Sequence, residues 1–326
     1  MLITAQEIER AVKILQTGGL VAFPTETVYG LGADASNAEA VRKIFRVKGR
    51  PEGHPLIVHI ADANKVNDWA SVFPEPAHRL AARFWPGPLT LILPRDPLVH
   101  DIVTGGQPTV ALRVPGHPVA LALLKAFGGG IAAPSANRFG KVSPTTAQHV
   151  YDDLGLDVDL ILDGGPCAVG IESTILDLSG PEPRILRPGG VDKEALEQTL
   201  GRTIPVVKSD SPVKAPGTLA SHYAPKAKVV VSTRSDLVRT ADRLRARGLK
   251  VAILTNEVPD RAPLGIETIL LPVSLAEMAR GLYDALREVD RRGFDAVVVS
   301  VPPAIGLGLA VADRLERAAG PDSPET

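Results

Sequence analysis

The chain of 326 residues contains a single cysteine, Cys167. One cysteine excludes an internal disulfide and any zinc site built from several cysteines. Aromatic residues make up 4% of the chain and the formal net charge is -1, so bulk attraction to nucleic acid is absent. No stretch reaches the apolar length of a membrane span, and no basic segment precedes an apolar run at the N-terminus. These absences predict a globular, cytoplasmic protein.

Several motifs are also missing. The seven histidines show neither H-x-x-x-H nor H-E-x-x-H spacing, and there is no G-x-x-x-x-G-K-[ST] phosphate loop. Gly30, Gly32 and Ala35 fit the dinucleotide pattern G-x-G-x-x-A, but a helix is expected only from Asn37 and the second strand lacks its acidic residue. We therefore reject a nicotinamide cofactor and expect these glycines to permit a tight turn beside a ligand.

The length allows two domains. Thr4 and Glu7 have capping-box spacing before the first predicted helix, and Asn37 is a predicted cap of the next. Strands are predicted at 20–23, 56–60, 89–93, 109–114, 160–162, 173–178 and 184–186, and further helices at 75–84, 118–127 and 145–154. Because strands and helices mix irregularly, residues 1–204 are predicted to form an α/β domain of α+β character, with a twisted mixed or antiparallel sheet and helices.

A composition break follows this region. Residues 205–228 are rich in Pro, Ser, Lys and Ala without apolar periodicity, which predicts a linker. Beyond it, strands at 229–231, 251–254 and 296–301 alternate with helices at 235–247 and 275–289. Residues 229–326 are therefore predicted to form a smaller, three-layer, Rossmann-like α/β domain with a largely parallel sheet.

Lys48 and Arg50 stand two residues apart on a turn constrained by Gly49 and Pro51. A planar guanidinium beside a compact ammonium suits a polyphosphate. A solvated basic helix end that complements the helix dipole explains the same pair equally well. His54 follows the turn, so the neighbourhood favours the ligand interpretation.

Arg113 ends an apolar strand, where it needs an anionic partner. That partner is either a structural carboxylate or a ligand's carboxylate or phosphate. The small residues of 128–137, with Ser135, permit close backbone approach and neutral hydrogen bonds, and Ser143 follows. Ser143 before Pro144 also fits a helix start. Ser135 lacks the G-x-S-x-G elbow, which excludes a serine hydrolase of that class.

Six segments in order resemble one family, the YrdC-like threonylcarbamoyladenylate synthases. They read FPTETVYGLGADA, KGRPEGHPLIVHI, FWPGPLTLIL, TVALRVPGHP, APSANRFGKVSPT and ESTILDLSG followed by RILRPGG. The resemblance covers about residues 1–200. The segment SHYAP at 221–225 and the region after it are similar to the long, two-domain form.

The resemblance implies a twisted sheet around a concave, positively charged cavity. It also implies a nucleotidyltransferase reaction in which L-threonine, bicarbonate and ATP give threonylcarbamoyl-AMP and pyrophosphate, the first step of threonylcarbamoyladenosine formation in tRNA. Mg2+ would be bound mainly through the phosphates, with no metal site of the protein's own. The threonine end would be lined by Thr27, His59, Arg113, Ala133 and Ser173, and the ATP end by Lys48, Arg50, His54, Thr109, Ser135, Ser143, Arg187 and, from the linker, Tyr223.

The predicted catalytic residues are Lys48, Arg50 and Arg113. Two anions must be neutralised and positioned, for which Lys48, Arg50 and Arg187 are the candidates. Arg113 is expected to hold the threonine carboxylate bidentately. His54 stands where many relatives carry Asn, which would make its contact pH-dependent. No residue stands out as a general base. Tyr223 is predicted to close over the nucleotide and exclude water.

The sequence also leaves other functions to consider. A carbamoyl-transfer enzyme with YrdC-like and zinc-finger regions conflicts with the single cysteine. A non-catalytic RNA-binding module that uses the basic cavity predicts salt-dependent RNA affinity without ATP turnover. A downstream tRNA threonylcarbamoyl transferase is the expected protein partner, and neither membrane nor strong nucleic-acid binding is expected. The role of the second domain stays open.

Overall fold

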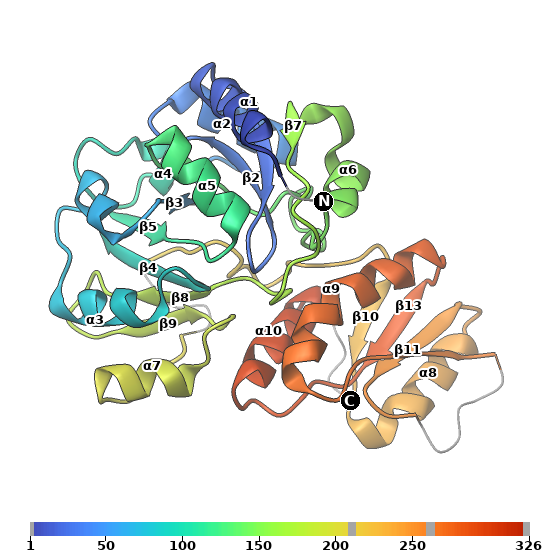
Figure 1. The fold of residues 1–326 in the computed structure, drawn as a ribbon. Helices are drawn as coiled ribbons and strands as arrows, with labels where there is room; N and C mark the ends of the chain where they lie inside the picture. Colours follow the sequence, from blue (N-terminus) through green and yellow to red (C-terminus); the bar gives the residue numbers. More distant parts are fainter. Residues whose placement is uncertain (1–2, 208–212, 259–264, 322–326) are drawn as a thin grey trace. The chain divides into compact units, whose positions relative to one another are not determined.

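The structure is a computed structural model that describes residues 3–207, 213–258 and 265–321. It divides into two compact units (Figure 1). The first comprises Met1–Phe139, Ser143–Ala168 and Glu172–Thr218, and the second Gly140–Val142, Val169–Ile171 and Leu219–Thr326. Among the described residues, no helix is long and apolar enough to cross a membrane.

The first unit is built on a nine-stranded sheet in the order β7-β1-β2-β6-β3-β5-β4-β8-β9. The strands are β1 (Val21–Pro24), β2 (Tyr29–Asp34), β3 (Ile57–His59), β4 (Leu89–Pro94), β5 (Thr109–Arg113), β6 (Ile131–Ala132), β7 (Leu160–Ile161), β8 (Thr174–Asp177) and β9 (Arg184–Arg187). Parallel pairs such as β3–β5 and β4–β8 stand beside antiparallel pairs such as β4–β5. The predicted mixed sheet is confirmed.

The helices of this unit begin and end at residues with clear local reasons. They are α1 (Ala5–Gln16), α2 (Ala38–Lys48), α3 (Glu75–Phe84), α4 (Asp101–Thr104), α5 (Pro118–Phe127), α6 (Ala147–Leu154) and α7 (Lys193–Leu200), with 3-10 turns η1 (Ala63–Asp68) and η2 (Gly155–Asp157). Thr4 and Glu7 form the predicted capping box of α1. The Asn37 side chain caps α2, and Gly49 ends it with a φ of 63°. The sequence did not predict α4 or α7.

Apolar side chains hold the helices against the sheet. Leu15 of α1 and Leu123 of α5 pack with Phe23 of β1 in one buried cluster. Burying a side chain of this kind contributes about 1.5–3 kcal/mol. Another cluster joins residues of β3, β4, β5, β8 and β9 to a residue of the predicted linker: Ile57, Ile92, Ala111, Ile175, Leu186 and Ala215. The linker residue Ala215 therefore packs against side chains of the sheet.

The glycines expected to form a tight turn lie instead in β2, and that expectation was wrong. A Cβ on Gly32 would lie 2.7 Å from Phe23 and 2.8 Å from Ile131, so the neighbouring strands leave no room for a side chain. A strand with few side chains lacks the apolar alternation from which strands are predicted. The same placement explains why the dinucleotide pattern is a coincidence.

The second unit has a four-stranded sheet in the order β10-β13-β11-β12, and all its pairs are parallel. Its elements are β10 (Lys228–Val231), η3 (Arg234–Asp236), α8 (Leu237–Arg245), β11 (Val251–Thr255), β12 (Glu267–Leu270), α9 (Leu275–Arg291), β13 (Ala296–Val299) and α10 (Leu307–Ala319). The predicted parallel α/β sheet is confirmed. The sequence did not predict β12, which is partly exposed, or α10.

The predicted linker forms no long helix or strand among its described residues. Ile185 of β9 donates its N–H to the carbonyl of Pro205 and accepts from the N–H of Val207. Residues 208–212 of this prediction lie outside the described part of the chain. Within the predicted linker, the described residues up to Thr218 belong to the first unit and those from Leu219 to the second.

Candidate active site

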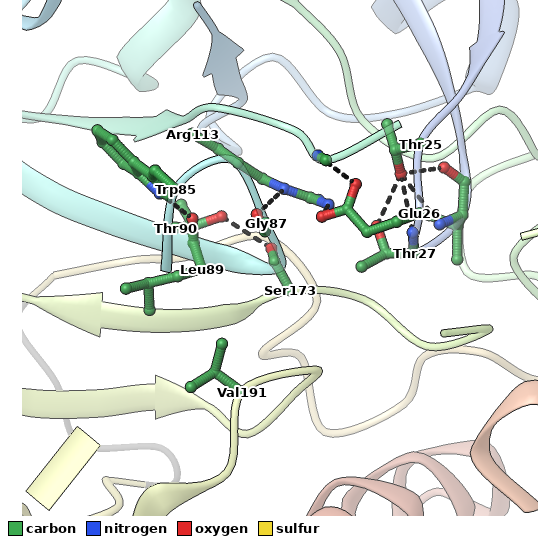
Figure 2. A network of polar contacts seen from close by, with 12 residues as sticks. Thr25, Glu26, Thr27, Trp85, Gly87, Leu89, Thr90, Arg113, Ser173 and Val191 are labelled. Atoms are coloured by element: carbon green, nitrogen blue, oxygen red, sulfur yellow. Dashed lines mark hydrogen bonds and ion pairs between the residues drawn. The ribbon is translucent and has the colours of Figure 1, made fainter. Parts of the chain in front are cut away.

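Arg113 ends β5 and lies at the centre of a polar network (Figure 2). Its Nη2 donates to Glu26 Oε1 at 2.7 Å, and its Nε donates to the carbonyl of Gly87 at 3.2 Å. The other carboxylate oxygen of Glu26 accepts from the N–H of Gly116 at 2.8 Å. The side chains of Arg113 and Glu26 are only 4% and 14% exposed. Of the two partners left open for Arg113, the structure supplies an internal carboxylate.

Glu26 is held by the turn between β1 and β2. Thr25 Oγ1 donates to the carbonyl of Val28 at 2.6 Å and lies 2.8 Å from Thr27 Oγ1. The N–H groups of Thr27 and Val28 both point to Thr25 Oγ1, at 3.2 Å. Such side-chain-to-backbone bonds fix a turn without help from a regular ladder. The turn therefore presents Glu26 and the fully buried Thr27 in one orientation.

Ser173 and Arg187 are in direct contact, although the resemblance assigns them to different ends of the site. Arg187 Nη2 donates to Ser173 Oγ at 3.1 Å, and its Nε and Nη2 donate to the Ser173 carbonyl at 3.2 and 2.8 Å. Ser173 Oγ also lies 2.8 Å from Thr90 Oγ1 at the start of β4. The three residues are buried. The structure thus joins the two predicted ends through adjacent strands.

The glycines after Arg187 make this contact possible. A Cβ on Gly189 would lie 2.3 Å from the carbonyl oxygen of Glu172 and 2.4 Å from the backbone of Ser173. Real side chains do not approach so closely, so a glycine is required where these two backbones touch. Gly190 then donates its N–H to the same carbonyl at 3.0 Å.

His59 lies opposite Arg113 on the neighbouring strand and is buried. Burial lowers the pKa of His59 to about 3, and the charge of Arg113 acts in the same direction. Its imidazole is therefore neutral near pH 7. Ala133 follows β6 and donates its N–H to the carbonyl of Ile57 at 3.0 Å, which places it beside the same strand.

Lys48 is the last residue of α2 and is almost completely buried. Its Nζ donates to the carbonyl oxygens of Ser135 and Asn137, each at 2.5 Å. Burial lowers the pKa of Lys48 well below its usual value, and the charge of Arg50 adds to this effect. A neighbouring anion would offset both causes. The ammonium therefore lies where binding of a negatively charged group is favoured.

Arg50 and His54 share the ring of Phe139. The guanidinium of Arg50 lies 5.5 Å from the ring centroid, and the His54 ring centroid lies 5.5 Å from it. Arg50 Nη2 also donates to the carbonyl of Pro55 at 2.9 Å. Burial lowers the pKa of His54, and the charges of Arg50 and then Lys214 act in the same direction. These two predicted nucleotide contacts are therefore neighbours.

Ser143 is fully buried and donates to Glu172 Oε1 at 2.6 Å. Glu172 directly precedes Ser173, so this bond links the segment of Ser143 to the Ser173–Arg187 contact. The linker residues from 213 onward also contact this part of the site, because Arg187 Nη1 donates to the carbonyl of Pro216 at 3.0 Å. Thr109 begins β5 and is buried.

Tyr223 belongs to the second unit. There its ring stacks on Tyr283 with centroids 5.9 Å apart, and the guanidinium of Arg314 lies 4.9 Å from its centroid. Its φ of 61° is in the left-handed region, which costs a residue with a side chain about 1–2 kcal/mol. The role of Tyr223 over a nucleotide stays a prediction.

Sequence reasoning gave no role to Glu26, Thr90, Glu172 or Phe139. Glu26 offered one signal, since a carboxylate between two threonines in a turn is poorly placed for the core. The partners of the other three lie far away in the sequence, so no local pattern marks them. Cys167 is buried; burial raises the pKa of its thiol to about 12, with the charge of Glu26 second, so it is not a thiolate nucleophile.

The chain matches two family models. The family model Sua5_yciO_yrdC, described as telomere recombination, matches residues 13–189. The chain belongs to this family. The model Sua5_C, described as the C-terminal domain of threonylcarbamoyl-AMP synthase, matches residues 191–320. The predicted resemblance to the two-domain form of this family is confirmed.

Relatives of this family are similar over nearly the whole chain. Threonylcarbamoyl-AMP synthases of Pyrococcus abyssi and Bacillus subtilis are each 44% identical, over 96% of this chain and 94% and 93% of their own lengths. The crystal structure of P. abyssi Sua5 complexed with L-threonine matches with a TM-score of 0.91 and 42% identity, over 98% of this chain and 96% of that one. Escherichia coli YciO matches 58% of this chain and 91% of its own, with a TM-score of 0.51 and 28% identity.

Proposed function

We propose that the chain is a threonylcarbamoyl-AMP synthase, which converts L-threonine, bicarbonate and ATP into threonylcarbamoyl-AMP, pyrophosphate and water. The activity named for relatives of the same two-domain length supports this proposal. The observation that carries it within the chain is the set of buried cations on the matching motifs: Lys48, Arg50, Arg113 and Arg187. A charge interacts more strongly with an anionic ligand where water is excluded than at an exposed surface, and this reaction brings together several anions.

Threonine binds at the end formed by Thr27, His59, Arg113, Ala133 and Ser173. The complex of P. abyssi Sua5 with L-threonine supports threonine as the substrate. Arg113 can hold the threonine carboxylate bidentately, as a guanidinium does in a fixed fork. Glu26, already beside Arg113 at 2.7 Å, is then placed to accept a hydrogen bond from the threonine ammonium. This contact fixes the direction of the threonine nitrogen, which attacks bicarbonate after the ammonium has lost a proton to water or to bicarbonate.

ATP binds at the end formed by Lys48, Arg50, His54, Thr109, Ser135, Ser143 and Arg187. The carbamate oxygen attacks the α-phosphate and pyrophosphate leaves. Because both reactants are negatively charged, the main contribution of Lys48 and Arg50 is to neutralise and position them. The depressed pKa of Lys48 rises again when phosphate approaches, so nucleotide binding favours its charged form.

The ATP end would accept Mg2+ together with the phosphates of ATP. Within the described part of the chain, no three His, Cys, Asp or Glu side chains gather to hold an ion. The cationic and hydroxyl donors at the ATP end fit an ion that keeps its waters and is held mainly by phosphate oxygens. When bound, the ion offsets phosphate charge.

The linker acts as a lid over the mixed anhydride product. Arg187 contacts Pro216, the charge of Lys214 acts on His54, and Ala215 packs on the sheet face that carries Ile57 and Ala111. Tyr223, farther along the same segment, completes the lid in this proposal. Excluding water protects an acyl phosphate from hydrolysis. The reaction takes place in the cytoplasm, and a tRNA threonylcarbamoyl transferase receives the product.

The test is pyrophosphate release by the purified chain with ATP and Mg2+, with threonine and bicarbonate added singly and together. We expect release only when both are present. Arg50→Ala should lower it at least a hundredfold, while the matched control Arg46→Ala, an exposed arginine on the last turn of α2, should not. Equal release without threonine, or equal loss in both variants, contradicts the proposal. RNA affinity with no ATP turnover would favour the binding-module alternative instead.

A further inference from the structure

The parallel sheet of the second unit contains a point where the helices change face. In sequence the strands follow as β10, β11, β12 and β13, but in space they lie as β10-β13-β11-β12. Crossovers between parallel strands are right-handed. The chain moves one way across the sheet from β10 to β11 and back again from β12 to β13, so α8 and α9 cover opposite faces (Figure 1).

The helices that follow the adjacent strands β10 and β13 therefore diverge. The helix after β10 is α8, which packs on β11 and β13. The helix after β13 is α10, which packs on β10 and beside α9 on the other face. Where two neighbouring strands send their chains to opposite faces, a crevice opens at their carboxyl ends, and open α/β sheets bind ligands there.

A cavity of about 1030 Å3 lies at this point. Its described lining residues come from the ends of β10, β11, β12 and β13 and from the start of α9: Val231–Arg234, Thr255, Asn256, Leu271, Val273, Leu275, Met278 and residues 300–303. The volume is at the upper end of the range that holds small-molecule ligands, about 300–1,000 Å3. All these residues belong to the second unit, and none of them has a role in the proposed synthase reaction.

The lining favours one kind of charge. Among the described residues that line the cavity, Arg234 is the only charged one, and none carries a carboxylate. Arg234 forms an exposed ion pair with Glu257, which is not a lining residue, so its guanidinium is held at the rim. A cationic ligand would find no partner in this lining, whereas a neutral or anionic one would.

The lining also combines an apolar surface with neutral hydrogen-bonding groups. Val273 is 73% exposed and Val301 36%, which leaves an apolar shelf open to a planar ligand. Thr233, Asn256 and Ser300 add two hydroxyls and an amide. Asn256 and Ser300 can bond to polar groups of a ligand, whereas the Thr233 hydroxyl already lies 3.0 Å from both Ser235 Oγ and Asp236 Oδ2.

We propose that this cavity binds a nucleoside monophosphate. A purine or pyrimidine base supplies the flat apolar face for the shelf, the ribose hydroxyls match the hydroxyls and amide at the strand ends, and the phosphate pairs with Arg234. None of the described lining residues carries a carboxylate that would repel the phosphate. None of the lining residues that the structure describes belongs to the proposed synthase site, so binding at this cavity can be tested independently of the proposed reaction.

The chain offers a specific probe, because it contains two methionines, Met1 and Met278, and Met278 lines the cavity. The experiment labels the methionine methyl groups of the full-length protein with 13C and titrates AMP, adenosine and inorganic phosphate in separate samples. Met278→Leu assigns the resonance, and Met1 serves as an internal control. We expect a saturable shift of the Met278 signal with AMP, and a weaker affinity for adenosine.

Variants then locate the response. Arg234→Glu should weaken AMP binding about tenfold or more, which equals about 1.4 kcal/mol. Arg239→Glu is the matched control, since it makes the same charge change on α8 at a 69% exposed side chain outside the lining. Arg50→Ala, which removes an ATP contact of the proposed active site, should leave the Met278 response unchanged.

Three outcomes overturn the proposal. The first is a Met278 signal that does not move with millimolar AMP. The second is a response abolished by Arg50→Ala but not by Arg234→Glu, which would assign it to the other nucleotide site. The third is equal saturation by phosphate and AMP with no effect of adenosine, which would show anion binding alone. None of these depends on the pyrophosphate assay.

Discussion

Acidification should destabilise the first unit through one buried side chain, His59. Its pKa is about 3 in the folded protein, because burial disfavours the charged ring and Arg113 repels it. In the unfolded chain a histidine has a pKa of about 6.5. Between these values the unfolded state binds one proton more, so the free energy of unfolding falls as the pH drops through this window.

The size of the effect follows from the two pKa values. Each pH unit inside the window changes the free energy of unfolding by up to about 1.4 kcal/mol. From pH 7.5 to pH 5, His59 alone should lower the free energy of unfolding by about 2 kcal/mol, and this decrease should continue toward pH 3. His59→Gln removes this proton, so the variant should lose about 2 kcal/mol less than the wild type over the same interval.

Urea unfolding at pH 7.5 and pH 5, followed by tryptophan fluorescence, measures this difference. The chain has two tryptophans, Trp69 and Trp85, both in the first unit, so the signal reports on the unit that contains His59. His78→Gln serves as the control, since His78 is exposed. Equal losses in wild type and His59→Gln, within about 0.5 kcal/mol, would refute the argument that burial keeps His59 neutral.

Three further predictions concern other parts of the first unit. Glu26→Gln should raise the KM for threonine at least tenfold with a much smaller change for ATP, as measured by initial rates; equal changes for both substrates would contradict its placement at the threonine end. Asn37→Ala should lower the free energy of unfolding by about 1 kcal/mol, because its side chain accepts from the N–H groups of Glu39 and Ala40, and Asn37→Ser should restore most of it. Gly189→Ala should lower the free energy of unfolding by about 1–3 kcal/mol and lower kcat/KM, because the added Cβ would clash with the backbone of Glu172 and Ser173. A variant with the stability and activity of the wild type would disprove this close approach.

Arg113 shows how far sequence reasoning reached into the site. Its position at the end of an apolar strand predicted an anionic partner, and the structure supplies Glu26 at 2.7 Å. The sequence did not identify Glu26 as that partner, because the two residues lie on β5 and on the turn between β1 and β2. Their contact depends on how the nine-stranded sheet orders its strands, which is not encoded in any short segment.

Helix caps and the spacing of apolar residues in the sequence were sufficient to predict several helices. The capping box of Thr4 and Glu7, the cap at Asn37 and the apolar periodicity of α3 and α5 predicted those helices closely. The composition change after residue 204 and the alternating pattern beyond it likewise indicated a second α/β region. These signals are set by hydrogen bonds and side-chain spacing within a few residues of each other.

Tertiary structure alone decided the rest. It made β2 a strand in spite of its glycines, since Phe23 and Ile131 fill the space that side chains would need. It brought Ser173 to Arg187 and Ser143 to Glu172. It also formed the cavity of the second unit from the ends of four strands. In each case the partners are far apart in sequence, and their contact follows from strand order and packing rather than from any property of the separate segments.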